Sequence, residues 1–169
     1  MSAEHPPPGH PHSGTRTGTP VRTAAVPVSA VLRLRAEVLR PGLPPERAEF
    51  AEDRRPGTVH LAAYAGETGT EVLGCITLFA DPLPGDATAH RFRGMATDPA
   101  VRGRGYGAAL LAAAEAEAAA RGAGTLWCNG RTGARGFYER HGYTVLGEEF
   151  LIEGVGPHYV FIRRLAPRA

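Results

Sequence analysis

Hydrophobic residues recur with a helical period in the first part of this chain of 169 residues. Between residues 29 and 39 they are three or four positions apart, which places Val31, Leu34 and Val38 on one face of a helix. Ser29 stands where this helix would begin, and serine is a favourable N-cap residue. The pattern therefore predicts an amphipathic helix that is half buried.

Other segments are short and rich in β-branched and aromatic residues, which favours strands. Two of them, 58–65 and 71–80, are separated by the polar sequence GETGT, which predicts a hairpin. By the same criteria we expect strands at 21–26, 58–65, 71–80, 89–97, 124–129, 143–152 and 158–165.

The strongest helix signal is the alanine-rich sequence AALLAAAEAEAAAR at 108–121. Glu117 and Arg121 are spaced for an i,i+4 ion pair, and Gly122 is placed to cap the end of the helix. Further helices are predicted at 45–53 and at 134–142. The element order β-α-α-β-β-β-α-β-α-β-β predicts an α/β fold (α+β in the stricter sense), with a central mixed sheet flanked by helices on both faces.

Length and composition are those of one globular domain, with 43% hydrophobic and 21% charged residues. Residues 1–20 contain almost no large apolar side chain, so we expect a disordered N-terminal arm followed by one domain over 21–169. No apolar run is long enough for a membrane helix, and the N-terminus lacks the core of a signal peptide. We therefore expect a cytoplasmic protein that does not interact with membranes.

The formal net charge of +2 gives no indication of nucleic-acid binding. Every basic residue other than histidine is arginine, and a P-loop cannot form because that motif requires lysine. Cys75 and Cys128 lie far apart in apolar segments, which predicts buried free thiols rather than a disulfide or a metal site.

The sequence RGRGYG at 102–107 comes between a predicted strand and the long helix. A glycine-rich turn that opens a helix is a ready anion site, because free N–H groups meet the positive end of the helix dipole there. A dinucleotide is one candidate ligand, since Gly103, Gly105 and Ala108 match the loose fingerprint G-x-G-x-x-G/A. However, the next strand ends at Asn129 without the expected carboxylate, and the turn follows four strands instead of one.

Coenzyme A is the other candidate. From Arg102 the turn has the pattern R-x-x-G-x-G, and RGMATDPAVRGRGYGAALL resembles the signature of the GNAT superfamily of acyl-CoA-dependent N-acyltransferases. ARGFYERHGY resembles the family segment A-x-x-F-Y-E-x-x-G-F, with Tyr143 in place of the usual phenylalanine. VLRLRAEVLRPG and EEFLIEGVGPHYVF resemble parts of a small bacterial branch, so the resemblance covers nearly all of residues 21–165.

The resemblance implies an N-acetyltransferase that uses acetyl-CoA as co-substrate. The acceptor would be the primary amine of a small molecule or peptide, attacking directly in a ternary complex, and a homodimer is possible. A non-catalytic acyl-CoA sensor of the same fold is the alternative. The resemblance assigns coenzyme binding to Met95, Ala96, Thr97, Arg102, Gly103, Arg104, Gly105, Tyr106, Gly107, Ala108 and Phe137.

Acyl transfer requires a deprotonated amine, a donor for the oxyanion and an acid for the leaving thiolate. The family uses backbone N–H groups of the fourth strand for the oxyanion and a tyrosine on the helix after strand five as the acid, which corresponds to Tyr138. The general base is open between Glu149, its neighbour Glu148, His158 and a chain of water molecules. His158 has the most suitable intrinsic pKa.

Two further features concern the substrates. Many family members have asparagine three residues before the helix alanine, whereas this chain has Arg131, which could meet a phosphate or a substrate carboxylate. Arg35 and Arg40 lie in the first helical region, which shapes the acceptor side in the family. They are expected either to meet an anionic group of the acceptor or, as ordinary surface arginines, to face solvent.

Overall fold

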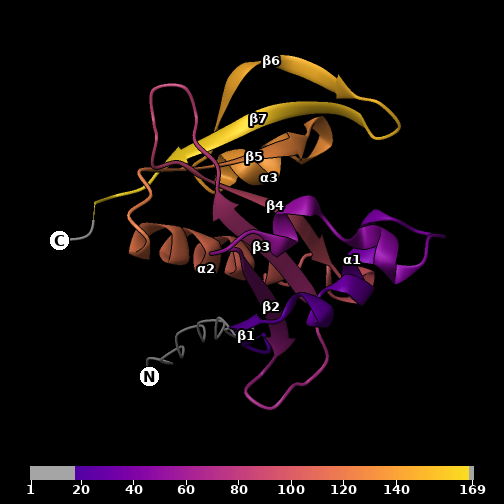
Figure 1. Cartoon of the computed structure of the whole chain (residues 1–169). Helices are drawn as coiled ribbons and strands as arrows, with labels where there is room; N and C mark the ends of the chain where they lie inside the picture. The colour runs from indigo at the N-terminus through magenta and orange to yellow at the C-terminus, as the bar shows by residue number, and fades with distance from the viewer. Residues whose placement is uncertain (1–17, 168–169) are drawn as a thin grey trace, which may run out of the picture.

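One seven-stranded sheet runs through the molecule in the computed structural model, which describes residues 18–167 (Figure 1). The strands follow the order β1-β2-β3-β4-β5-β7-β6, and among the described residues β4 and β5 are the one parallel pair of neighbours. The strands are β1 Val21–Val26, β2 Val59–Ala65, β3 Gly74–Ala80, β4 His90–Thr97, β5 Thr125–Arg131, β6 Thr144–Ile152 and β7 Gly156–Arg164. The predicted mixed sheet is confirmed.

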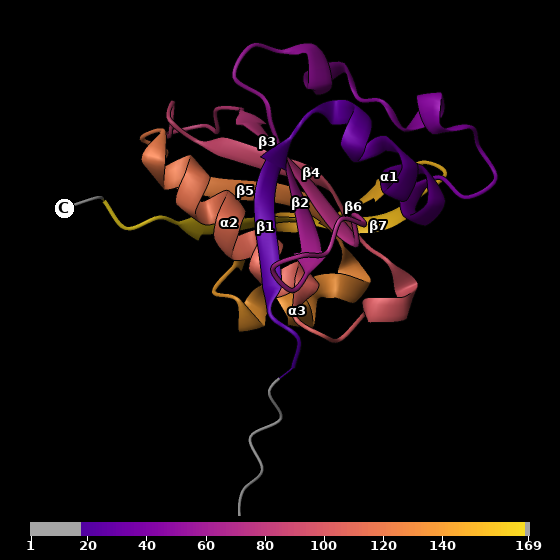
Figure 2. The same cartoon turned by 90° about the horizontal axis from the view of Figure 1, so that it is seen from below.

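Helices cover both faces of this sheet, as the sequence predicts (Figure 2). Helix α1 (Leu32–Leu39) packs on β3 and β4, whereas α2 (Tyr106–Ala120) packs on β1 to β4 from the opposite face. Helix α3 (Arg135–Arg140) lies beside α2 on that second face. The main hydrophobic cluster lies under α2 and α3, and a smaller cluster lies under α1.

The ends of the two later helices follow from local sequence. Gly122 has φ 82°, and the N–H of Ala123 donates to the carbonyl of Ala118 at 3.0 Å, so the predicted glycine cap of α2 is confirmed. The predicted pair of Arg121 and Glu117 forms with an Nε–Oε1 distance of 2.9 Å. Gly142, with φ 84°, ends α3 in the same way.

The start of the first helix differs from the prediction. Residues Val28–Ala30 form a 3₁₀ turn, and α1 begins only after Val31, so the N-cap role of Ser29 is wrong. Pro27, which precedes this turn, has an extended backbone, and its carbonyl accepts a hydrogen bond from the N–H of Ala30. This hydrogen bond closes the 3₁₀ turn before the α-helix begins. The apolar face is confirmed, because Val31 and Leu34 are buried.

The helix predicted at 45–53 is also wrong. Two 3₁₀ turns, Pro45–Ala48 and Ala51–Arg54, replace it, and Phe50 between them is extended with φ −108° and ψ 151°. The N–H of Phe50 donates to the Asp53 carboxylate at 2.8 Å and so makes no helical hydrogen bond. The ring of Phe50 lies under two guanidinium groups, 4.0 Å from the Cζ of Arg35 and 3.8 Å from that of Arg93.

Both cysteines are buried free thiols, as predicted. Burial raises the pKa of Cys75 to about 11 and that of Cys128 to about 12, so both remain protonated and unreactive at neutral pH. The predicted disordered arm lies outside the described residues, except for residues 18–20. Within residues 18–167 no helix is long and apolar enough to span a membrane.

Arg35 is fully buried. The expectation that it faces solvent or an anionic group of the acceptor is therefore wrong. Arg35 follows Val31 by four residues and precedes Val38 by three, so it lies within the apolar face of α1. Its guanidinium donates to the Asp53 carboxylate at 2.8 Å and to the Thr77 hydroxyl at 2.7 Å. The arginine therefore joins α1 to β3 and to the second 3₁₀ turn.

Arg35→Ala should lower the free energy of unfolding by about 3–5 kcal/mol, because Asp53 would remain buried without its partner. Arg33→Ala is the matched control: Arg33 lies on the same helix but forms an exposed pair with Glu37 at 3.5 Å, worth less than about 1 kcal/mol. Urea unfolding of both variants measures the difference. Equal losses would contradict a stabilising role for the buried pair.

Candidate functional site

The two central strands of the sheet separate soon after they meet. β4 and β5 pair at His90 with Leu126 and at Arg91 with Trp127, and no further pairs follow. β4 continues to Thr97, whereas the rest of β5 pairs with β7 alone. The β5-facing edge of β4 therefore has no strand partner over residues 92–97 among the described residues, and its N–H and C=O groups are available to a ligand.

A β-bulge in β4 lies at the start of this free edge. Thr77 pairs with Arg93 and Cys75 with Ala96, so two residues of β4 stand opposite one of β3. Gly94 at the bulge has φ 64°, a conformation that favours glycine. A Cβ at Gly94 would lie 2.7 Å from Cε2 of Phe50, so the segment after α1 packs directly against the bulge.

The glycine-rich turn follows β4 and opens α2. Gly103 has φ 75° and Gly105 has φ 90°, and Gly105 is the N-cap of the helix. Several N–H groups here make no backbone hydrogen bond among the described residues, including those of Gly103, Gly105, Tyr106, Gly107 and Ala108. Together with the positive end of the dipole of α2, they form a site suited to a phosphate anion.

The side chains of the turn differ in their surroundings. Arg102 and Arg104 are exposed, whereas the ring of Tyr106 is buried in the main cluster, so Tyr106 can offer a ligand its N–H but not its hydroxyl group. Phe137 of α3 packs on the first turn of α2, since a Cβ at Gly107 would lie 3.3 Å from its Cζ. Phe137 of α3 therefore borders the first turn of α2 next to the anion site.

The three predicted residues of β4 all lie along its free edge. Met95 is half buried against the main cluster, and Ala96 is buried in the smaller cluster under α1. Thr97 pairs with Gly74 of β3 and is half buried. Their side chains point to both faces of the sheet, so a ligand lying along this edge would meet mainly backbone groups.

Tyr138 of α3 is 6% exposed and lies among aromatic rings beneath the opening between β4 and β5. Its ring stacks on Phe161 with centroids 4.5 Å apart. Burial and the neighbouring sulfur of Cys128 raise the pKa of Tyr138 well above its ordinary value. The hydroxyl therefore keeps its proton at neutral pH, and in this surrounding it is a weaker acid than an exposed tyrosine.

His158 of β7 lies on the other face of the sheet. It precedes Phe161 by three residues in a regularly paired strand, so the two side chains point in opposite directions. His158 is 5% exposed, and its Nδ1 lies 2.7 Å from the carbonyl of Gly156. Since a carbonyl only accepts, Nδ1 carries a proton, and in the neutral ring it is Nε2 that has the lone pair.

The predicted residues at the end of β5 and on β6 make no hydrogen bond with Tyr138 among the described residues. Glu149 is exposed, and its Oε2 accepts the hydroxyl proton of Thr132 at 2.8 Å. Arg131 is exposed and stands opposite His158 in the register of β5 and β7. Among the described residues no hydrogen bond joins Glu149 or His158 to Tyr138, so the structure does not bring the candidate base and acid into direct contact.

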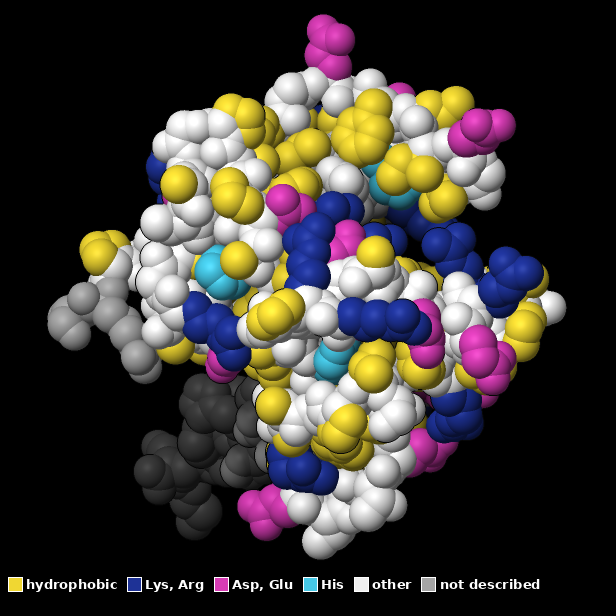
Figure 3. Space-filling model, viewed as in Figure 1, with side chains coloured by type: hydrophobic (Ala, Val, Ile, Leu, Met, Phe, Trp, Pro, Cys, Tyr) yellow, Lys and Arg dark blue, Asp and Glu magenta, His cyan; other side chains and the backbone are white. Residues whose placement is uncertain are grey.

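Arginine side chains lie across the middle of the α1 face, below hydrophobic side chains over the β6–β7 hairpin (Figure 3). Arg93 pairs with Glu52 at 3.2 Å, and Arg91 pairs with Asp81 at 3.5 Å. Burial alone would raise the pKa of Glu52, but hydrogen bonds and the charge of Arg93 hold it below its usual value. Sequence reasoning missed the Arg93–Glu52 pair because it joins residues 41 positions apart.

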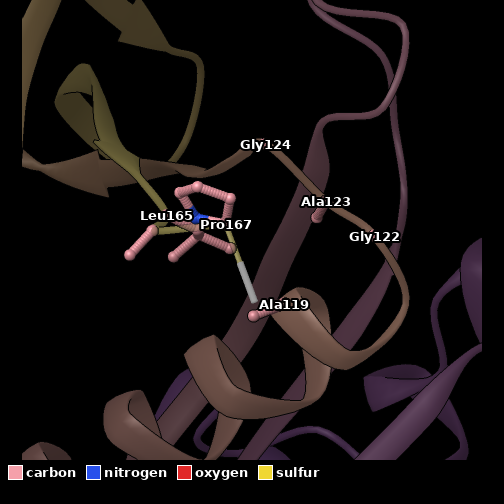
Figure 4. A pocket seen from close by; sticks show the side chains of 7 residues that line it. Ala119, Gly122, Ala123, Gly124, Leu165 and Pro167 are labelled. Atoms are coloured by element: carbon pink, nitrogen blue, oxygen red, sulfur yellow. The ribbon is translucent and has the colours of Figure 1, made fainter. Parts of the chain in front are cut away.

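A hollow of about 420 Å³ lies elsewhere, at the C-terminal end of α2 (Figure 4). Alanine, glycine, leucine and proline residues line it, including Ala119 and Leu165, and no side chain there carries a polar atom. The helix of 15 residues separates this hollow from the glycine turn by about 22 Å. It offers no chemistry related to the anion site.

Comparison with known proteins agrees with this geometry. Residues 29–143 match the model of the acetyltransferase (GNAT) family. The uncharacterized N-acetyltransferase YitI of Bacillus subtilis (strain 168) is 33% identical over 140 residues, which cover 83% of this chain and 93% of YitI. The chain therefore belongs to the acetyltransferase (GNAT) family.

Solved structures show the same fold. One from Lactobacillus plantarum has a TM-score of 0.70 and 24% identity, covering 88% of this chain and 99% of the other. An acyl-CoA N-acyltransferase from Pseudomonas aeruginosa has a TM-score of 0.65 and 21% identity, covering 85% and 99%. As a member of this family, the protein is an acyltransferase that uses an acyl-CoA co-substrate and an amine acceptor.

Gly105→Val should abolish the rise in melting temperature that acetyl-CoA produces, because the side chain would block the approach of phosphate to the N–H groups. Bound ligand at 100 times Kd would otherwise stabilise the fold by about 2.7 kcal/mol. Gly85→Val is the matched control, since Gly85 has φ 83° and equally open surroundings but lies in the β3–β4 connection.

Both variants strain the backbone alike, so only Gly105→Val should lose the shift. A preserved shift in Gly105→Val would place the phosphate site elsewhere. A shift with NADH and none with acetyl-CoA would favour the dinucleotide.

Proposed function

We propose that the protein transfers the acetyl group of acetyl-CoA to the primary amine of a small molecule or peptide. The observation that carries the proposal is the free edge of β4, which leads directly into the glycine turn with its unpaired N–H groups. An elongated ligand with a phosphate group at one end and amide groups along its length fits both features. The name of the relative YitI supports acetyl as the acyl group.

The coenzyme would lie between α2 and α3. The N–H groups of Gly103 and of residues 105–108 would hold its pyrophosphate, and exposed Arg102 and Arg104 would add positive charge. Met95, Ala96 and Thr97 would offer backbone groups to the pantetheine arm. An N–H group of the same strand would stabilise the negative charge that develops on the thioester oxygen.

Proton transfer would take place on both faces of the sheet. On the α3 face, the hydroxyl of Tyr138 would donate its proton to the departing thiolate, and Phe137 would hold the first turn of α2 beside it. On the α1 face, Nε2 of His158 would accept the proton of the amine, directly or through water. Glu149 is the second candidate base, because its carboxylate is exposed beside the end of β5.

Three expectations from the sequence stay predictions. They are the location in the cytoplasm, the absence of nucleic-acid partners and the possible homodimer. The arginine side chains of the α1 face are largely paired with carboxylates, so they give no independent indication of a polyanionic partner.

Release of free thiol from acetyl-CoA should be measured across a panel of amines, amino acids, polyamines and peptides. Turnover with any of them, at a rate that depends on pH, would support the proposed reaction and identify the acceptor class. Tight binding of acetyl-CoA without turnover across a broad panel would favour the sensor. Propionyl-CoA and longer acyl-CoA donors in the same assay test the preference for acetyl.

Tyr138→Phe should lower kcat by roughly 10²–10⁴, because it removes the proton donor and keeps the ring. The Kd for acetyl-CoA and the melting temperature should change little, since the turn and the core are untouched. Tyr143→Phe is the matched control: its ring lies 5.8 Å from Tyr138, but its hydroxyl donates to Glu115 at 3.1 Å. It should lower stability and leave kcat nearly unchanged. Lost stability with intact kcat in Tyr138→Phe would refute the catalytic assignment.

A further inference from the structure

Gly130 lies where β5 passes the rings of Tyr138 and Phe161. A Cβ at this position would be 2.7 Å from Cε2 of Tyr138 and 2.6 Å from Cδ2 of Phe161. Carbon atoms in favourable contact are about 3.5–4.0 Å apart, so only the hydrogen of glycine fits here. The backbone of Gly130 is not in the left-handed region, so the reason for glycine is the space between the two rings.

The ring of Tyr138 is in contact with other aromatic rings, so its position depends on how these rings pack. It is stacked on Phe161 at an interplanar angle of 27°, and three other rings surround it. The centroid distances are 5.4 Å to Phe137, 5.8 Å to Tyr143 and 6.2 Å to Phe92. A side chain at position 130 would therefore displace the hydroxyl of Tyr138 together with its ring.

We propose that Gly130 and Phe161 are positioning residues that act as a pair. The absent side chain of Gly130 admits the ring of Phe161, and Phe161 in turn fixes the ring of Tyr138 by stacking. The pair thereby sets the position from which the hydroxyl of Tyr138 donates its proton. This inference rests on the acid role proposed for Tyr138, and a displacement of about 1 Å at a reacting group can cost about 100-fold in rate.

Gly130→Ala should lower kcat at least about tenfold. It should leave the Kd for acetyl-CoA unchanged, because the atoms nearest to a Cβ at residue 130 belong to Phe161 and Tyr138 and not to the glycine turn. The matched control is Gly133→Ala in the connection after β5, where a Cβ would meet nothing within 4 Å. This control should keep the kcat, Kd and melting temperature of the wild type. A normal kcat in Gly130→Ala would overturn the proposal.

A double variant separates positioning from general damage to the core. Phe161→Met alone should lower kcat, because a flexible side chain no longer fixes the stacked ring. Combined with Gly130→Ala it should lower kcat by much less than the product of the two single effects, since methionine yields to the new methyl group. If the double variant is as slow as the product of the two single effects, the pair does not act together. If Gly130→Ala alone is too unstable to assay, the double variant is compared directly with Phe161→Met, and a further large loss of kcat in the double variant would overturn the pairing.

The Tyr138→Phe background distinguishes this inference from the proposed function. Once the hydroxyl is absent its position no longer matters, so Gly130→Ala should cause no further loss of kcat there. An equal loss in both backgrounds would refute the positioning role and leave the acid role of Tyr138 intact. An unchanged kcat in Tyr138→Phe itself would instead refute the acid role, and the proposal for Gly130 with it.

Discussion

The short pairing of β4 with β5 is the constraint on which the site depends. Two residue pairs join the halves of the sheet, and beyond them each strand is held only by its outer neighbour, β3 or β7. Buried backbone groups require partners, so the free edge of β4 favours a ligand with amide groups of its own. The two candidate proton-transfer residues lie on opposite faces of the sheet, Tyr138 on the α3 face and His158 on the α1 face.

The free strand has to keep its shape without a neighbour, and the segment after α1 provides the support. Phe50 lies against the bulge at Gly94, between the guanidinium groups of Arg35 and Arg93. Asp53 and Glu52 of the following turn pair with these two arginines. The α1 side of the molecule thus supports the strand that would hold the thioester.

The sequence predicts best what is decided locally. The alanine-rich helix, its cap at Gly122 and the turn around Gly105 follow from residues close together in the chain, and each appears as expected. The helix predicted at 45–53 is wrong because of long-range contacts. Arginines from α1 and β4 hold Phe50 in an extended conformation, and local propensity cannot reveal such contacts. The burial of Arg35 was within reach, because its spacing from Val31 places it on the apolar face. No local pattern could indicate which of Glu149 and His158 stands closer to the reacting amine.

The use of arginine in place of lysine throughout the chain has a consequence for the protein's own chemistry. All 19 strongly basic residues are arginine, so ion pairs such as Arg35–Asp53 and Arg93–Glu52 contain no primary amine. A guanidinium keeps its proton at any physiological pH and does not attack a thioester. The chain can therefore remain in contact with a reactive acyl donor without acylating its own basic side chains, whereas lysines in the same positions would be potential acceptors.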